Sequence, residues 1–327
     1  MFDAIATLAK TIHEGRERLR KRIVAIRTEG GTKILKTKRT GFPKSVAAID
    51  SGFVTYSMHG ADIVAVRSAG AVFYYSHDSL TNSVLVSDDT PDPQVEIKHA
   101  LDEHDSGVYR SLVRLKYELL RAIEIVEKYS PEFLFLDGSL LPLACDRPAA
   151  SSELMQMHAE IIKTYRRLYE TCDRRGTQLC GIVKDSRSIR FAKKAGFDCS
   201  DSVFFGMLLE AVEYSEIVRY FDEANKNTEK EFNLVAERIG FFYLKASKEE
   251  IPLRVEFLQK SQNKFDDEQI VSVIFSLSSI SESFAYPAVL VEADLRAAIN
   301  QHDVKHIEST LLSFGISPMR RDNRPFR

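Results

Sequence analysis

Two short apolar runs, each followed by an aspartate, constrain the fold of this chain more than any other feature. Val46–Ile49 leads into Asp50, and Phe133–Leu136 leads into Asp137. Apolar runs of this length beside Gly and Ser are typical of buried strands. In α/β proteins, ligands and catalytic groups collect at the carboxyl ends of such strands. We therefore expect each aspartate at a strand end and, if the strands are neighbours, both in one small volume.

The order of the remaining elements predicts how these strands are arranged. The pattern indicates an N-terminal helix (2–28) followed by three strands (46–50, 61–67 and 71–76). Helices at 105–129 and 151–174 then alternate with strands at 133–137 and 178–183. A hairpin (240–258) and C-terminal helices (266–314) complete the chain. Ser68-Ala69-Gly70 is expected to separate the second and third strands, and Ser151 to cap the second long helix. Antiparallel strands followed by β-α-β crossovers imply an α/β fold with one mixed sheet flanked by helices. In a ribonuclease H-like sheet this order places the first strand beside the fourth, with Asp50 next to Asp137.

Composition excludes several classes of protein. The chain has 327 residues, 44% hydrophobic and 28% charged, which is typical of a globular protein. Its apolar stretches are far shorter than the roughly 20 residues of a membrane span, and no basic leader precedes an apolar segment at the N-terminus. The four cysteines form no C-x-x-C pair, which argues against zinc. We expect a cytoplasmic protein with no membrane partner.

Positive charge is concentrated at the two ends of the chain. The formal net charge is only −2, but Lys10 to Lys44 contains twelve basic and three acidic residues, and the tail from Arg320 to Arg327 is also basic. Such local excesses can follow a phosphate backbone, or simply form a solvated helix face and a frayed end. We divide the chain into a basic amphipathic helix and connector (1–44), a main domain (45–315) and a basic tail (316–327).

Carboxylates beside the two aspartates suggest a metal site. Glu118 lies at the border of the apolar stripe of the helix before Asp137, and we prefer it to Glu124 for that reason. Two aspartates and a glutamate offer the hard oxygen ligands that suit Mg²⁺ or Mn²⁺, which can promote hydrolysis at phosphorus. Lys184 ends the next strand and could neutralise charge on a phosphate. The alternatives are a turn-capping role for each aspartate, a surface role for Glu118 and a loop role for Lys184.

Weaker or contradictory signals surround these residues. Tyr286-Pro287 and Asp294 sit at a late helix start, where core packing and a solvated face are the ordinary roles. The run ending in Asp137-Gly138 is similar to that of haloacid dehalogenase-type phosphohydrolases, but Phe135 occupies the position of their nucleophile and cannot form an aspartyl-phosphate. No phosphate-binding loop of the G-x-x-x-x-G-K-[ST] type is present, so ATP-driven motion would require a partner.

Together, these motifs resemble the NurA nuclease family. The likeness rests on Ala48-Ile49-Asp50-Ser51-Gly52, on the helix with Glu118, on Leu136-Asp137-Gly138-Ser139-Leu140, on Val183-Lys184-Asp185-Ser186 and on Tyr286-Pro287 with Glu292-Ala293-Asp294. The first motif reads Asp-Ser-Gly where the family commonly has Asp-Gly-Ser, and Asp294 stands where some members have histidine.

The resemblance implies a fold, a chemistry and a set of partners. It implies a ribonuclease H-like core and a Mn²⁺-dependent DNA nuclease, with Asp50, Glu118 and Asp137 as metal ligands. Tyr286 and Asp294 would occupy the active-site positions that come late in the family's sequence. It also implies 5′→3′ exonuclease and single-strand endonuclease activity, a homodimer, and a HerA-type hexameric ATPase as partner in DNA end resection and repair. The alternative is a catalytically inactive ribonuclease H-like module that binds DNA or a motor.

Overall fold

The computed structural model describes residues 2–29, 32–58, 61–87, 93–99, 101–220, 233, 235–259 and 264–315. Its elements are α1 (Phe2–Glu29), β1 (Ile34–Lys36), β2 (Ser45–Met58), β3 (Ala61–Ser76), β4 (Ser79–Val86), β5 (Gln94–His99), α2 (Glu103–Tyr129), β6 (Phe133–Asp137), the 3₁₀ turn η1 (Ala144–Asp146), α3 (Met155–Arg175), β7 (Gln178–Val183), α4 (Arg190–Lys194), α5 (Asp201–Leu208), β8 (Glu213–Ser215), β9 (Val218–Arg219), β10 (Ile239–Lys245), β11 (Leu253–Leu258), α8 (Asp267–Ser278), α9 (Ala288–Ala297) and α10 (Gln301–Ser313). The predicted basic tail (316–327) lies outside the described residues.

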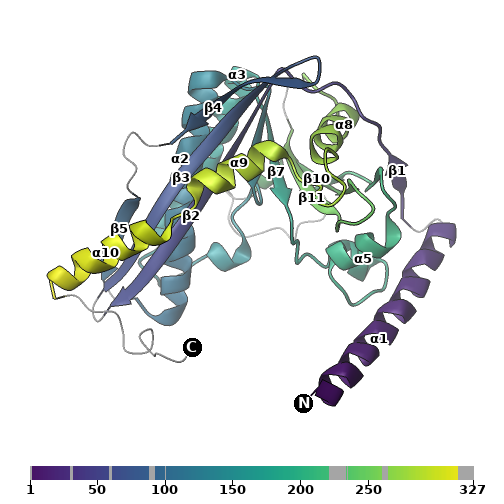
Figure 1. The fold of residues 1–327 in the computed structure, drawn as a ribbon, viewed down its shortest axis with the longest axis horizontal. Helices are drawn as coiled ribbons and strands as arrows, with labels where there is room; N and C mark the ends of the chain where they lie inside the picture. The colour runs from purple at the N-terminus through teal and green to yellow at the C-terminus, as the bar shows by residue number, and fades with distance from the viewer. Residues whose placement is uncertain are drawn as a thin grey trace.

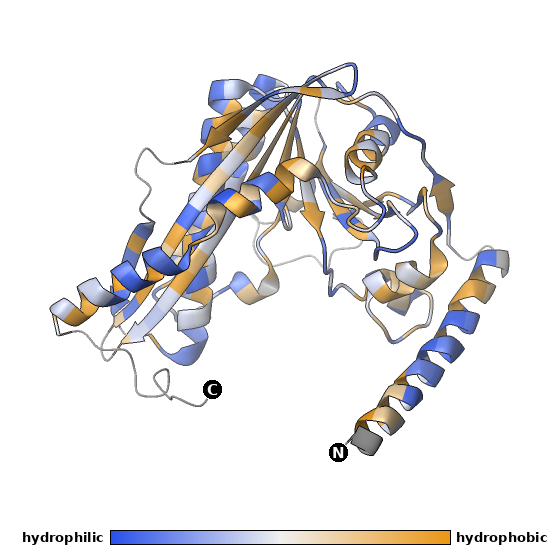
Figure 2. Cartoon of the chain, in the orientation of Figure 1, coloured by the Kyte–Doolittle hydropathy of each residue, from blue (hydrophilic) through white to orange (hydrophobic). Residues whose placement is uncertain are grey.

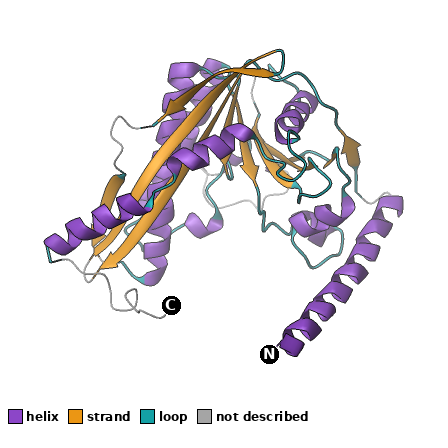
Figure 3. Cartoon of the chain, viewed as in Figure 1, coloured by secondary structure: helices purple, strands orange, loops and turns teal. Residues whose placement is uncertain are grey.

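One mixed sheet organises the described part of the chain (Figure 3). Its eleven strands follow the path β1-β8-β10-β11-β7-β6-β2-β3-β4, with β5 on β3 and β9 on β10. β2 pairs in parallel with β6, and β6 with β7, whereas the other pairings are antiparallel. The expected ribonuclease H-like arrangement is confirmed, because the first predicted strand (β2) lies beside the fourth (β6).

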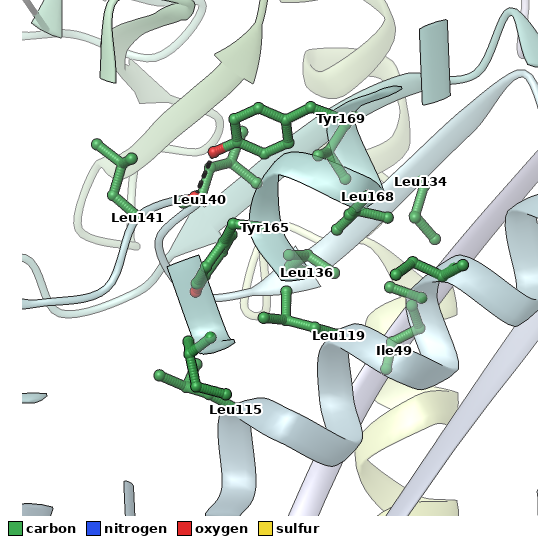
Figure 4. Packing of buried hydrophobic residues seen from close by; sticks show 14 of the residues in the cluster. Ile49, Leu115, Leu119, Leu134, Leu136, Leu140, Leu141, Tyr165, Leu168 and Tyr169 are labelled. Carbon is green, nitrogen blue, oxygen red and sulfur yellow. Dashed lines mark hydrogen bonds between the residues drawn. The ribbon is translucent and has the colours of Figure 1, made fainter. Parts of the chain in front are cut away.

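Alternate side chains of the central strands face helices α2 and α3. Apolar residues recur every three or four positions in α2, which places their side chains on one face of the helix. A buried cluster joins the sheet to both helices (Figure 4), and it includes Ile49, Leu134, Leu136, Leu115, Leu119, Tyr165 and Leu168. Tyr169 of α3 also donates a hydrogen bond of 2.5 Å to the carbonyl of Leu140, just after β6. The two helices therefore hold the carboxyl end of β6 in place.

The opposite face of the sheet is covered by α8 and α9. Phe133 and Phe135 of β6 pack there with Ile274 of α8 and Leu290 of α9. α9 crosses β2 and β3, and α10 continues along the far ends of the same strands (Figure 1). Gly52 allows this approach, because a Cβ atom at that position would lie 2.4 Å from the carbonyl oxygen of Ala297.

The strands around Asp50 are longer than predicted. β2 continues from Asp50 to Met58, so Asp50 lies within its strand and only Asp137 ends one. The two strands expected at 61–67 and 71–76 are one strand, β3, and its residues 61–74 pair with β2. Gly70 does not form a turn there. Its missing side chain makes room for Ile125 of α2, whose Cδ1 would lie 2.4 Å from a Cβ atom.

Two further expectations about local structure were incomplete or wrong. Ser151 does not cap α3, which begins at Met155 without a side-chain cap. Ser152 orders this entry instead, since its hydroxyl accepts the N–H of Leu154 and donates to Asp105 of α2. The short strands β1, β5, β8 and β9 were also missed. Each is six residues or fewer, and pairing with distant strands stabilises them more than any local pattern.

The N-terminal helix packs on the rest of the described chain through its second half. Ile23 of α1 is buried against a cluster formed mainly by α4, α5 and β10. Ile5, Leu8 and Ile12 are exposed by 57%, 60% and 55%, and they form an apolar stripe on a polar helix (Figure 2). No described helix is long and apolar enough to cross a membrane.

Gly52→Ala tests the close contact between α9 and β2. The added methyl group must displace the backbone at Ala297, so we expect a loss of about 1–3 kcal/mol in the free energy of unfolding. Gly107→Ala in α2 is the matched control, because no atom lies within 4 Å of its Cβ position. That substitution should stabilise by about 0.5–1 kcal/mol. Urea unfolding measures both, and equal effects would contradict the packing described for α9.

Candidate active site

The parallel register of β2 and β6 brings the two predicted aspartates together. The last paired residues are Ile49 and Leu136, so Asp50 and Asp137 are the next residues on adjacent strands. Both are partly buried, and Asp50 accepts a hydrogen bond of 2.7 Å from the backbone N–H of Ser51. Burial, followed by the charges of Asp137 and Glu118 and the neighbouring carboxyl group of Asp294, raises the pKa of Asp50 to about 7. The pair therefore concentrates negative charge at the point where β6 ends.

Lys184 and Tyr286 both bind Asp137. Lys184 follows β7, the strand next to β6, and its Nζ lies 2.8 Å from Oδ2 of Asp137. Tyr286 precedes α9 and donates its hydroxyl to Oδ1 at 3.0 Å. Nζ of Lys184 also lies 4.3 Å from the centroid of the Tyr286 ring. Burial and the charge of Asp137 raise the pKa of Tyr286 above its ordinary value, so its hydroxyl remains a donor.

Asp294 reaches the site from α9. Because α9 lies against β2 and β3, a residue two turns into the helix stands over Asp50. The carboxyl group of Asp294 contributes to the raised pKa of Asp50, so the two side chains lie near one another. The structure thus brings together five of the predicted residues, Asp50, Asp137, Lys184, Tyr286 and Asp294.

Glu118 borders this group from the α2 side of the sheet. Its buried carboxylate accepts the hydroxyl of Ser51 at 2.8 Å and pairs with Arg114 at 2.7 Å. Burial raises the pKa of Glu118, and the nearby charge of Asp137 adds to the effect. Glu124, the alternative considered from sequence, is 47% exposed and pairs with Arg121. Its surroundings are those of a surface residue, so the geometry favours Glu118.

Three contacts of the site were not anticipated from sequence. Ser51 and Arg114 hold Glu118, and Glu256 of β11 holds the turn after Asp137. Arg114 could have been found, because it lies four residues before Glu118 on the same helix and so faces it. Ser51 follows Asp50 and points to the opposite side of the sheet, which strand alternation predicts. Glu256 gave no local signal, because it is distant in sequence.

Glu256 fixes the backbone that carries Asp137. One of its oxygens accepts the hydroxyl of Ser139 at 2.8 Å and the N–H of Leu140 at 2.9 Å. Its other oxygen pairs with Arg254, and both side chains are more than nine-tenths buried. Gly138 completes the turn with a φ of 139°, which favours glycine, and its N–H donates to Ile182 of β7. The turn is therefore held from two neighbouring strands.

The donor set fits a hard divalent cation. Four carboxylates, Asp50, Asp137, Asp294 and Glu118, gather here, and the ion pairs that the described residues make with them come from Lys184 and Arg114. Oxygen ligands of this kind suit Mg²⁺ or Mn²⁺, and a cation would offset the burial and the repulsion that raise the pKa of Asp50. Among the described residues, no group of three or more carboxylates, histidines or cysteines already has the arrangement of a metal site. Asp137 is instead bound by Lys184 and Tyr286.

The sheet order and the acidic edge define a protein with a ribonuclease H-like fold, and comparisons with known proteins identify its family. A model of the NurA domain matches residues 44–299, more than half of the chain. The chain therefore belongs to the NurA family and contains a NurA-family nuclease domain. No curated protein matches the sequence.

Solved structures agree with this assignment. The NurA nuclease from Sulfolobus solfataricus has 15% sequence identity and a TM-score of 0.64, over 96% of this chain and 97% of that one. A structure of NurA bound to dAMP and manganese has 11% identity and a TM-score of 0.57, over 98% of each chain. A further NurA structure with manganese has 9% identity and a TM-score of 0.57, over 96% of this chain and 98% of that one. At these identities the likeness establishes the fold.

Glu256→Gln tests the buried support of the Asp137 turn. The substitution leaves the charge of Arg254 buried without its partner, so we expect a loss of about 3–5 kcal/mol in the free energy of unfolding. Glu170→Gln is the matched control, because Glu170 pairs with Arg166 on the surface, where both side chains are at least 60% exposed. That change should cost less than about 0.5 kcal/mol. A small effect of Glu256→Gln in urea unfolding would contradict the support assigned to this pair.

Proposed function

We propose that this chain is a divalent-metal-dependent DNA nuclease. The observation that carries the proposal is the convergence of Asp50, Asp137, Asp294, Lys184 and Tyr286 within a NurA domain. In this proposal Asp50, Glu118, Asp137 and Asp294 hold Mn²⁺ or Mg²⁺. The bound ion supplies Lewis-acid stabilisation of charge at phosphorus and a source of hydroxide at neutral pH. The NurA structures solved with manganese, one of them with dAMP, support this choice of ion and ligand.

The chain's own residues position the phosphodiester and its charge. Lys184 stands beside Asp137 with a side chain that is 43% exposed, so its ammonium group can reach a phosphate as well as the carboxylate. Preorganised cations of this kind stabilise the negative charge that develops during phosphodiester hydrolysis. Tyr286 orients Asp137 through its hydroxyl and restrains Lys184 with its ring. Glu118 is oriented by Ser51 and Arg114 from the other face of the sheet.

Basic residues near α1 support a path for a DNA strand. Arg16, Arg20 and Lys248 line a hollow of about 830 Å³ between α1 and α5. A second hollow of about 460 Å³ shares Arg16 and Lys245 with the first and extends to Asp185, the neighbour of Lys184. It is also lined by Arg187, Glu249 and Glu250. Lysine and arginine along a groove bind a phosphate backbone without regard to sequence. We infer that a DNA strand reaches the acidic edge along these hollows.

The finer activities and partners are inferred from the family. We propose 5′→3′ exonuclease and single-strand endonuclease activity, in DNA end resection and repair with a HerA-type hexameric ATPase. A homodimer is supported by the exposed stripe of Ile5, Leu8 and Ile12 on α1, since apolar stripes on solvated helices commonly pack against another chain.

Asp137→Asn tests the catalytic assignment. With Mn²⁺ and a labelled single-stranded oligonucleotide, cleavage should fall more than about 100-fold, because even outer-shell partners of metal ligands typically contribute 10–100-fold. Asp50→Asn should behave in the same way. Glu124→Gln is the control and should retain activity, since Glu124 is 47% exposed and pairs with Arg121 of its own helix. Full cleavage by Asp137→Asn would overturn the assignment. DNA binding without cleavage by the unsubstituted protein would favour an inactive binding module.

Divalent ions should also stabilise the folded protein. An ion that binds only the native state adds about 2.7 kcal/mol at a concentration 100 times its dissociation constant. We therefore expect Mn²⁺ to raise the melting temperature by several degrees and EDTA to reverse the rise. Asp137→Asn should lose this response, and K⁺ at matched ionic strength should not reproduce it. An equal response in the variant would show that the ion binds elsewhere.

A further inference from the structure

A small hollow lies directly beside Lys184 and Tyr286. Its volume is about 170 Å³, and Phe284, Ile251 and Asp185 complete most of its wall. Phe284 belongs to the segment between α8 and α9, and Ile251 to the segment between β10 and β11. Because Lys184 and Tyr286 both bind Asp137, a group in this hollow stands next to the carboxylate edge. The proposed nuclease mechanism does not use this hollow.

The rim of the hollow is unusually apolar for an exposed surface. Phe284 is 53% exposed and Ile251 is 49% exposed, although single exposed apolar residues elsewhere need no explanation. Here two of them, from separate segments, face one hollow at the active site. The Phe284 and Tyr286 rings meet in a T-shaped arrangement with centroids 6.1 Å apart, which restrains the Phe284 ring beside the hollow.

We propose that this hollow binds one unpaired nucleobase of the DNA strand, stacked on Phe284 and adjacent to the phosphate at Lys184. This inference rests on the proposed nuclease function and specifies that the DNA is unpaired at the position next to the cleaved bond. Aromatic side chains bind bases of any sequence in this way, because every base has a flat π-face.

Size and charge select a base over other parts of DNA. The hollow is small, with a volume of about 170 Å³, which suits one ring system better than a base pair. Lys184 is the residue of the wall assigned to the adjacent phosphate, and the other charged residues that line the hollow are Asp185 and Glu250. Their carboxylates can accept hydrogen bonds from base amino groups. A duplex must therefore open at this position before it is cleaved.

Phe284→Ala, compared on intact and abasic DNA, tests the proposal. The substrates are single-stranded oligonucleotides with Mn²⁺, either complete or with one base removed from a defined nucleotide. The unsubstituted protein should cleave poorly at the bond next to the missing base. Phe284→Ala should raise KM on intact DNA about 5- to 150-fold, the equivalent of ~1–3 kcal/mol per stacked base, and should lose the extra defect at the abasic position. Phe284→Tyr should restore the normal pattern.

Ile280→Ala is the matched control. Ile280 lies in the same segment, is 57% exposed and does not line the hollow, so its substitution should change neither KM nor the abasic pattern. Equal defects of Phe284→Ala on intact and abasic DNA, or a similar defect of Ile280→Ala, would overturn the proposal.

A second readout separates this inference from the nuclease function. In EDTA, an oligonucleotide containing 2-aminopurine should change its fluorescence on binding the unsubstituted protein, and Phe284→Ala should abolish that change. A fluorescence change that depends on Phe284, without cleavage in Mn²⁺, would retain the base site and reject the nuclease. Cleavage with no dependence on Phe284 in either assay would reject the base site alone.

Discussion

Parallel hydrogen bonding between β2 and β6 determines where the acidic side chains of this protein stand. The register that pairs Ile49 with Leu136 leaves Asp50 and Asp137 side by side, one residue beyond the last pair. Strand alternation then turns both toward the face covered by α9. A shift of one residue would move either aspartate to the α2 side. The apolar residues before each aspartate are buried on alternating faces, so the core itself fixes the register.

Placing carboxylates together opposes folding, and the surrounding structure offsets that cost. Burial and neighbouring charges raise the pKa of Asp50 to about 7, which shows how unfavourable its ionised form is there. Lys184 and Tyr286 bind Asp137, while Arg114 and Ser51 bind Glu118. Glu256 holds the following turn through buried hydrogen bonds. The site is thus a region of electrostatic strain on a rigid support, the condition in which a divalent cation binds with most benefit.

Sequence alone predicted the elements whose residues interact locally. The α2 stripe and the apolar run of β6 were recognised because their periodicity repeats over neighbouring residues. The length of β3 was not recognised, because a glycine at position 70 suggests a turn unless its contact with Ile125 is known. The residues of the site also divide into those that the sequence revealed and those that only the structure revealed. The candidate residues were found from strand ends and from the family resemblance, and the structure brings them together. Glu256 was missed, because its contact with Ser139 joins positions 117 residues apart.

A crystal structure of the protein grown with Mn²⁺ would test the central claim most directly. Data collected at the manganese absorption edge locate the ion independently of the protein atoms. The account predicts an anomalous peak between Asp50 and Asp137, and its loss in crystals of Asp137→Asn. A peak only at other residues, or no peak at saturating Mn²⁺ while Lys184 and Tyr286 still bind Asp137, would contradict the assignment of this acidic edge as a metal site.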